Sequence, residues 1–138
     1  MTVPPRTLVT AARHLLLPEP GSESSLSPGL RARAAAVLLR MALEQAVDAY
    51  WRRITPSMTR VGKHRILCLE WYEGPQTARQ CRTTWSALSA ACHYRTSELP
   101  PAPAEIHTRL LEVTALLAAL SAPDESTVRQ EGGIAPTP

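Results

Sequence analysis

Apolar residues recur at spacings of three and four along most of the chain, and prolines separate the stretches in which they do so. Four long stretches contain no proline, at residues 29–55, 57–74, 76–99 and 104–122. Proline inside a helix removes a backbone donor and clashes with the preceding turn, although the first helical position tolerates it. We therefore predict one helix in each stretch, with the breaks between helices at the prolines.

The first two stretches give apolar faces of mixed composition. The first helix is expected to begin at Pro28, with Ser27 as its N-cap, and to end near Arg53. Its expected apolar residues are Val37, Leu38, Met41, Val47, Tyr50, Trp51 and Ile54. The second helix, with Ser57 as a candidate cap, is expected to bury Val61, Leu67, Cys68, Trp71 and Tyr72.

The last two stretches show the helical spacing most clearly. In the third it places on one side Ala78, Cys81, Trp85, Leu88 and Cys92. In the fourth it does the same for Ile106, Leu110, Val113, Leu117 and Leu120. Four helices with short connections can enclose one core. We predict an all-α protein, an antiparallel up-and-down bundle of four main helices plus a short N-terminal helix.

The ends of the chain differ from the middle. Residues 1–27 are expected to hold the short helix and a flexible polar linker, and residues 28–121 to form the bundle domain. The Gly-rich, Pro-rich and acidic residues 122–138 are expected to be a disordered tail. The chain has no Phe, so Leu, Ala and Val must fill most of the core, which suits close-packed helices.

Charge is distributed unevenly along the chain. Residues 29–99 hold eleven Lys or Arg against five Asp or Glu, whereas the remainder holds four against seven. Fourteen of the fifteen cations are Arg, whose fork of donors matches phosphate and carboxylate groups. This composition fits a phosphate-binding protein and equally a GC-rich coding sequence.

The three cysteines form no C-x-x-C pair and lie among apolar neighbours, which predicts buried free thiols. We expect neither a metal site nor a cofactor, because zinc-ligand spacing, glycine-rich phosphate loops and H-E-x-x-H are all missing from the sequence. No secretory signal is apparent, and no stretch has the roughly 20 apolar residues of a membrane span. A cytoplasmic protein that does not associate with membranes is the expectation.

The third stretch carries a polar row opposite its apolar side. Arg82, Ser86, Ser89 and His93 follow one another at spacings of four, three and four, and Arg79 extends the row by one turn. Such a row could bind a phosphodiester strand, with His93 as the candidate catalytic acid or base. It is equally the solvated side that every amphipathic helix has.

Further cations are candidates for nucleic-acid binding. Arg95 follows the row, and a weaker basic cluster spans the first two long stretches with Arg52, Arg53, Arg60, Lys63 and Arg65. Against binding by this cluster, Arg52 and Arg53 lie where cations stabilise the C-terminal end of a helix without any ligand. A solvated basic turn is therefore the alternative interpretation.

One helix resembles a known family. Residues 84–94, TWSALSAACHY, with Glu98-Leu99-Pro100 after them, resemble the histidine-bearing helix of small bacterial HEPN-type domains, and residues 33–51 are similar to their long opening helix. The resemblance covers about residues 28–121. It implies a bundle of four to five helices, frequently dimeric, that acts as a metal-independent ribonuclease toxin or as an RNA-binding or structural partner. Family nucleases carry an Arg, four to six residues and then the His, and here only His93 corresponds.

Two functional hypotheses follow. The first is a HEPN-like domain that binds RNA or a protein partner in a toxin–antitoxin or defence setting. If it cleaves RNA, His93 acts at the ribose hydroxyl with Arg79, Arg82 or Arg95 on the phosphate. The alternative is a helical adaptor without chemistry, which an exposed apolar patch would indicate. A homodimer through one of the long helices is compatible with both.

Overall fold

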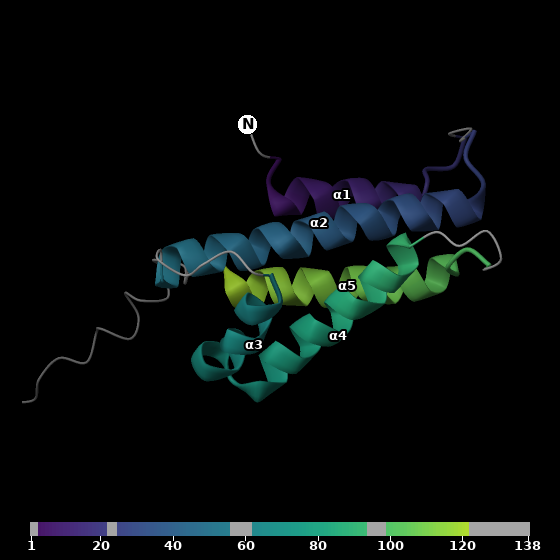
Figure 1. The fold of residues 1–138 in the computed structure, drawn as a ribbon. Coiled ribbons are helices and arrows are strands. Elements are labelled where there is room, and N and C mark those ends of the chain that lie inside the picture. Colours follow the sequence, from purple (N-terminus) through teal and green to yellow (C-terminus); the bar gives the residue numbers. More distant parts are fainter. Residues whose placement is uncertain (1–2, 22–24, 56–61, 94–98, 122–138) are drawn as a thin grey trace, which may run out of the picture.

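The computed structural model describes residues 3–21, 25–55, 62–93 and 99–121, and for residues 62–67 it describes the backbone alone. These residues form five helices and no strand (Figure 1). In chain order the helices are α1 (Pro5–Leu16), α2 (Pro28–Ile54), α3 (Gly62–Glu73), α4 (Pro75–Cys92) and α5 (Pro103–Leu120). The prediction of an all-α protein is confirmed.

Proline marks the beginnings of the helices, as the sequence predicts. Every helix except α3 has proline in its first turn, where the missing N–H would have had no helical partner. Ser27 caps α2, since its Oγ accepts a hydrogen bond of 3.3 Å from the backbone N–H of Leu30. Between α3 and α4 stands Gly74 alone, with φ +91°, a left-handed conformation that favours glycine. The predicted cap Ser57 lies outside the described residues.

Helix α2 is the centre of the fold. Its 27 residues contact each of the other four helices (Figure 1). The side that it buries is made largely of small residues, namely Ala32, Ala35, Ala36, Ala42 and Ala46, with Leu39, Leu43 and Val47 between them. Small side chains let the backbones of neighbouring helices approach closely. The core is therefore built on an alanine surface.

The predicted apolar face of α2 is wrong in part. Tyr50 and Trp51 are buried, but Val37 and Met41 are each 42% exposed and Ile54, the last residue of the helix, is 41% exposed. Helix α2 has two apolar sides, and the larger aliphatic residues lie opposite the alanines. Close packing of α1, α4 and α5 selects the alanine side, so the aliphatic side remains at the surface.

The core consists of two groups of buried side chains. One joins α1, α2, α4 and α5, and the residues that α1 contributes are Leu8, Val9 and Ala12. The other joins α2, α3, α4 and α5 around Trp51 and Leu69. The predicted domain boundaries remain predictions, and residues 122–138 lie outside the described part.

The described side chains of α3, residues 68–73, are mostly exposed, which corrects the prediction for two aromatic residues. Trp71 is 89% exposed and Tyr72 is 54% exposed, whereas Leu69 is fully buried and Cys68 is half-buried. Helix α3 packs mainly on α4, and its last four residues, 70–73, are exposed. Trp51 fills the space between α2 and α3, with its ring edge-to-face against Tyr72 at 5.2 Å between centroids. The side chains of Val61 and Leu67 are among those not described.

None of the described helices combines the length and the hydropathy that crossing a membrane requires.

Candidate functional site

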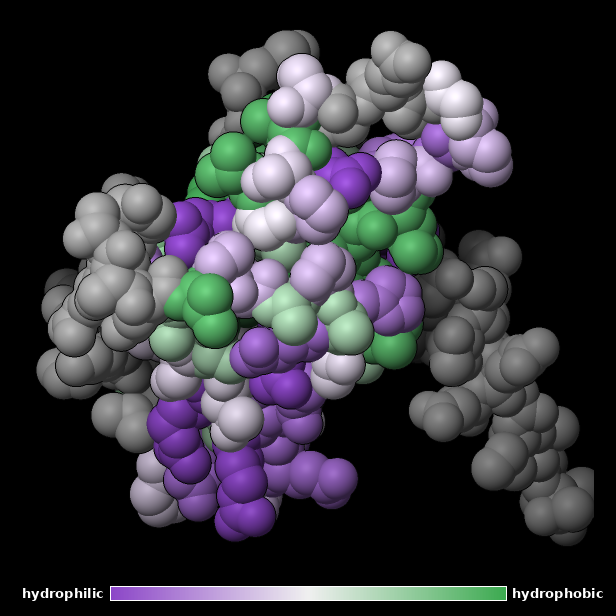
Figure 2. Space-filling view, turned by 90° about the vertical axis from the view of Figure 1, so that its right-hand side faces the viewer, coloured by the Kyte–Doolittle hydropathy of each residue, from purple (hydrophilic) through white to green (hydrophobic). Residues whose placement is uncertain are grey.

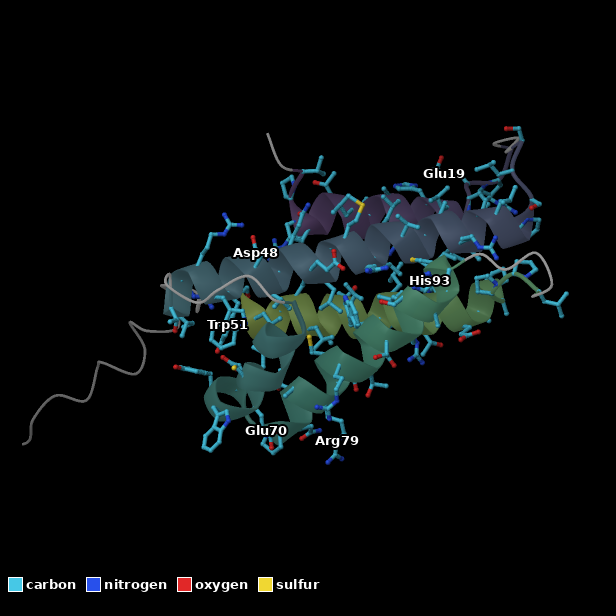
Figure 3. All side chains as sticks on the ribbon, in the orientation of Figure 1. Glu19, Asp48, Trp51, Glu70, Arg79 and His93 are labelled. Atoms are coloured by element: carbon cyan, nitrogen blue, oxygen red, sulfur yellow. The ribbon has the colours of Figure 1, made fainter. Side chains whose placement is uncertain are left out.

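The polar row of α4 is exposed in large part. Arg79, Arg82 and Ser86 face solvent, and His93 is exposed directly after Cys92, where α4 ends. Figure 3 places Arg79 and His93 at opposite ends of this helix. At ~1.5 Å per residue, Arg82 and His93 lie about 16 Å apart along the axis.

Ser89 does not belong to this row, which corrects the prediction. It is half-buried, and its Oγ is enclosed without a hydrogen-bond partner among the described residues. The next residue, Ala90, is exposed.

The charge of the row is uncompensated within the helix. Helix α4 contains no Asp or Glu, and neither Arg79 nor Arg82 forms an ion pair with any described residue. The lower part of Figure 2, at the height where α3 and α4 lie in Figure 1, is correspondingly hydrophilic, whereas hydrophobic residues gather in the upper part, at the height of α1 and α2. A chain of anions would meet two open guanidinium groups here.

A polar cluster fixes α4 on α2. Glu44 Oε1 accepts a hydrogen bond of 3.0 Å from Arg40 Nε and one of 3.2 Å from Trp85 Nε1. The Arg40 guanidinium also lies 5.4 Å from the centroid of the Trp85 ring, within the range of a cation–π contact. Burial raises the pKa of the Cys92 thiol, and a hydrogen bond with Arg40 opposes this shift. These contacts hold the end of α4 that carries His93.

A second polar link fixes α4 on α5. Thr84, which is fully buried, donates a hydrogen bond of 2.8 Å to Glu112 Oε2 and accepts one of 3.0 Å from Gln80 Nε2. Arg109 forms an ion pair with the same Glu112 oxygen at 3.2 Å. With α2 on one side and α5 on the other, α4 presents its row outward. Thr84 could not be recognised from the sequence as a buried residue, because threonine there is one more polar position on α4.

The weaker basic cluster is occupied by internal contacts where it is described. Arg52 pairs with Asp48 at 2.7 Å, one turn before it. Arg53 donates a hydrogen bond of 3.1 Å to the carbonyl of Leu120 at the end of α5, and its guanidinium lies 5.5 Å from the centroid of the Tyr50 ring. Arg60 and Arg95, and the side chains of Lys63 and Arg65, lie outside the described part.

A groove that the sequence analysis did not predict lies between α1, α2 and α5. Its volume is about 700 Å³. Three arginines line it, Arg6 and Arg13 from α1 and Arg53 from α2, together with apolar residues of all three helices. Because these residues are far apart in the sequence, no local pattern indicates the groove.

The described side chains form neither a cluster of metal ligands nor a disulfide. Across residues 3–21, 25–55, 68–93 and 99–121, no three His, Cys, Asp or Glu side chains gather as a metal site would require. All three cysteines are unpaired, with Cys81 buried and the other two half-buried.

Neither a scan against protein-family models nor searches of curated proteins and of solved structures find a match to this chain.

Proposed function

We propose that this protein binds RNA through the outward face of α4. The observation that carries the proposal is the row of Arg79, Arg82, Ser86 and His93, exposed on one helix that has no acidic residue. A guanidinium group presents several donors to a phosphate, and backbone phosphates recur along a strand whatever its sequence. The separation of the arginines from His93 suits contacts with several nucleotides.

An exposed aromatic residue supports the same proposal. Trp71 is 89% exposed and stands near the end of α3, immediately before the turn into α4. Stacking of a base on an aromatic ring contributes about 1–3 kcal/mol in proteins that bind single strands. Trp71 is therefore proposed as a stacking platform for an unpaired base.

The role of His93 is proposed from the resemblance to HEPN-type domains, together with a toxin–antitoxin or defence setting. Its imidazole is exposed, so it is accessible to a ribose hydroxyl as acid or base. Cleavage also requires a cation on the reacting phosphate, and Arg82 is about 16 Å away along the helix axis. Candidates for that cation are Arg33 and Arg40, which influence the neighbouring Cys92. Further candidates are a residue outside the described part and a second copy of the chain.

We further propose that α1 and α4 run antiparallel to α2, whereas α5 runs parallel to it. Gly29 at the start of α2 lies against Pro100 just before α5, and Arg53 at the end of α2 donates to the carbonyl of Leu120 at the end of α5. In Figure 1, α1 runs from left to right and α2 from right to left.

Along the interface between α2 and α4, Glu44 meets Trp85 near the middle of α4, while Arg33 and Arg40 influence Cys92 at its end. As the residue number rises along α2, the number of the residue that it contacts on α4 therefore falls.

The proposal is tested by anisotropy of a labelled single-stranded RNA titrated with protein at several salt concentrations. Replacing both arginines by glutamine (R79Q with R82Q) is expected to weaken binding about tenfold or more at low salt. The slope of log K against log salt is expected to fall by about 1.4, because roughly 0.7 of a counterion is released for each phosphate contact on a single strand. Unchanged affinity and slope would remove α4 as the binding face.

A matched control is available in Arg52→Gln, since Arg52 is exposed but already paired with Asp48. It is expected to leave RNA affinity within about twofold of the wild type. Cleavage is tested separately by comparing wild type with His93→Ala on the same RNA. Equal turnover in both would eliminate His93 as the catalyst without bearing on binding.

A second candidate function, docking of another copy of this chain, is favoured by one specific observation. Leu30, Val37 and Met41 are 52%, 42% and 42% exposed, and their spacings of seven and four place them on one side of α2. Sedimentation of wild type against Val37→Glu with Met41→Glu tests this candidate. A wild type that is monomeric at every concentration would exclude it.

A further inference from the structure

We propose that the groove between α1, α2 and α5 is a binding site for a small anionic amphiphile, a carboxylate on an unbranched alkyl chain. This site lies on other elements than the outward face of α4. It therefore does not depend on whether α4 binds RNA.

The interior of the groove is apolar and has room for a ligand. Val9 and Leu120 are buried beneath it, and Ala46, Ala49 and Ala118 leave space where longer side chains would fill it. The volume of about 700 Å³ lies within the range of sites for small molecules. The lining follows α1 from Pro4 to Arg13, roughly 13 Å at ~1.5 Å per residue, which accommodates an alkyl chain of medium length.

The charge at the groove has one sign. Arg6, Arg13 and Arg53 line it, and none of the described lining residues is acidic. Within the described part of the chain, neither Arg6 nor Arg13 takes part in an ion pair. Like charges gathered around apolar surface repel one another, so an anion in the groove would relieve an unfavourable interaction. Charge complementarity therefore selects an anionic head.

Two structural details favour the end formed by Arg6 and Arg53 for that head. Arg53 is held in place by the carbonyl of Leu120 and the Tyr50 ring, so a guanidinium with further donors is already oriented. Helix α1 begins beside Arg6 without a side-chain cap and without an acidic residue in its first turn. The positive end of the helix dipole adds to the attraction of the arginines for an anion.

The hydroxyl groups of the lining offer no free donors to a sugar or a base. Thr10, Thr114 and Ser121 each donate to a carbonyl of their own helix, at 3.0, 2.8 and 2.8 Å respectively. Neutral polar ligands need several hydrogen-bond partners at fixed positions, and here the arginines alone supply donors that are free to turn toward the groove. An apolar body with a single charged head matches this lining.

The test is calorimetric titration of the full chain with decanoate, decanol and acetate, each kept below the concentration at which it aggregates. Decanoate is expected to bind, decanol to bind about tenfold more weakly because it lacks the charge, and acetate to give no detectable binding. Equal affinity for decanol and decanoate, or no binding of decanoate, would overturn the proposal.

Two pairs of variants locate the binding. Ala49 is exposed and lines the groove, so Ala49→Leu fills the groove and is expected to weaken the affinity for decanoate at least about tenfold. Ala115 is exposed on α5 but lies outside the groove, so Ala115→Leu is expected to leave this affinity unchanged. Arg6→Gln is expected to weaken decanoate roughly fivefold, whereas Arg52→Gln, which lies outside the groove, has no effect. Melting temperatures near that of the wild type show that each variant is folded. Decanoate affinity that is unchanged in the folded Ala49→Leu protein would contradict the assignment.

Discussion

The hydroxyl of Thr84 and the carboxylate of Glu112 form a hydrogen bond of 2.8 Å across the interface between α4 and α5. Thr84 has no exposed surface, whereas the Glu112 side chain retains 24% of its exposure. A buried donor thus meets an acceptor that also holds Arg109. This link sets the rotation of α4 about its own axis, and with it the direction in which Arg79 and Arg82 point.

Thr84→Val removes this hydrogen bond while keeping the shape of the side chain. The carboxylate of Glu112 loses a partner, and Gln80 loses its acceptor, so the free energy of unfolding is expected to fall by about 1–2 kcal/mol. Urea denaturation measures the change. The adjacent Thr83→Val is the control, because Thr83 is exposed and the substitution should alter stability by less than about 0.5 kcal/mol. Equal losses in both variants would show that the link does not contribute.

Truncating the two tryptophans at the α2–α3 end is expected to change the free energy of unfolding by very different amounts. Trp51 is 1% exposed and Trp71 is 89% exposed. Trp51→Ala leaves a cavity between α2 and α3 and is expected to cost about 3–5 kcal/mol of unfolding free energy. Trp71→Ala is expected to stay within about 0.5 kcal/mol of wild type, and its RNA affinity is expected to fall if Trp71 stacks on a base. A large loss of stability in Trp71→Ala would contradict its exposure.

Replacing Gly29 by alanine is expected to destabilise the protein, although the same replacement within a helix is usually stabilising. Alanine normally stabilises a helix by roughly 0.5–1 kcal/mol over glycine. Here a Cβ would lie 2.7 Å from Cγ and 2.8 Å from Cβ of Pro100, whose ring is stiff. Gly29→Ala is therefore expected to destabilise the protein by about 1–2 kcal/mol, measured by thermal unfolding.

A double-mutant cycle isolates this contact. In a Pro100→Ala background the clash is gone, so Gly29→Ala should become neutral or stabilising. A penalty of the same size in both backgrounds would mean that Pro100 is not its cause.

Stability is expected to decrease at alkaline pH. Burial raises the pKa of the Cys81 thiol to about 11, and burial together with a hydrogen bond to Glu73 raises the pKa of the Tyr50 hydroxyl to about 12. The folded state therefore favours the neutral forms, while in the unfolded chain the pKa values are near 9.0 and 10.0. The contribution of Cys81 is complete below about pH 9 and is lost as the pH rises through about 11.

Urea midpoints measured on both sides of this window check the prediction. Each group should reduce the unfolding free energy by up to roughly 1.4 kcal/mol per pH unit within its window. Cys81→Ala, although less stable throughout, should show a shallower decline between about pH 9 and 11. A decline of identical steepness would assign the alkaline effect to other groups.

The sequence predicts the helices well because proline and the first-turn cap act locally. The starts at Pro28, Pro75 and Pro103 and the capping by Ser27 needed no tertiary information. The buried side of α5 was also accessible, since most of its predicted residues, such as Ile106 and Val113, are buried. Local chemistry thus suffices for the beginning of a helix at proline and for a helix with a single apolar side, but not for the end of α4, which stops at Cys92 within the proline-free stretch 76–99.

The sequence fails where a helix offers more than one apolar side. On α2 the size of Val37 and Met41 predicts that they belong to the core, yet the alanines opposite them permit closer approach of the neighbouring helices. Trp71 is exposed because α3 packs mainly on one neighbour, a fact of tertiary arrangement. The exposed row of α4 followed from helical spacing, except at Ser89, whereas the groove required three helices to be placed in space.

The central position of α2 has a consequence for how the molecule opens. Since every other helix rests on α2, its amide protons in the middle of the helix should exchange with deuterium only when the entire protein unfolds. Helix α3, attached mainly through α4, can detach alone and expose its amides at a lower energetic cost. Trp71 therefore lies on the helix that is expected to unfold first. RNA stacked on Trp71 would slow amide exchange in α3 more than in any other helix.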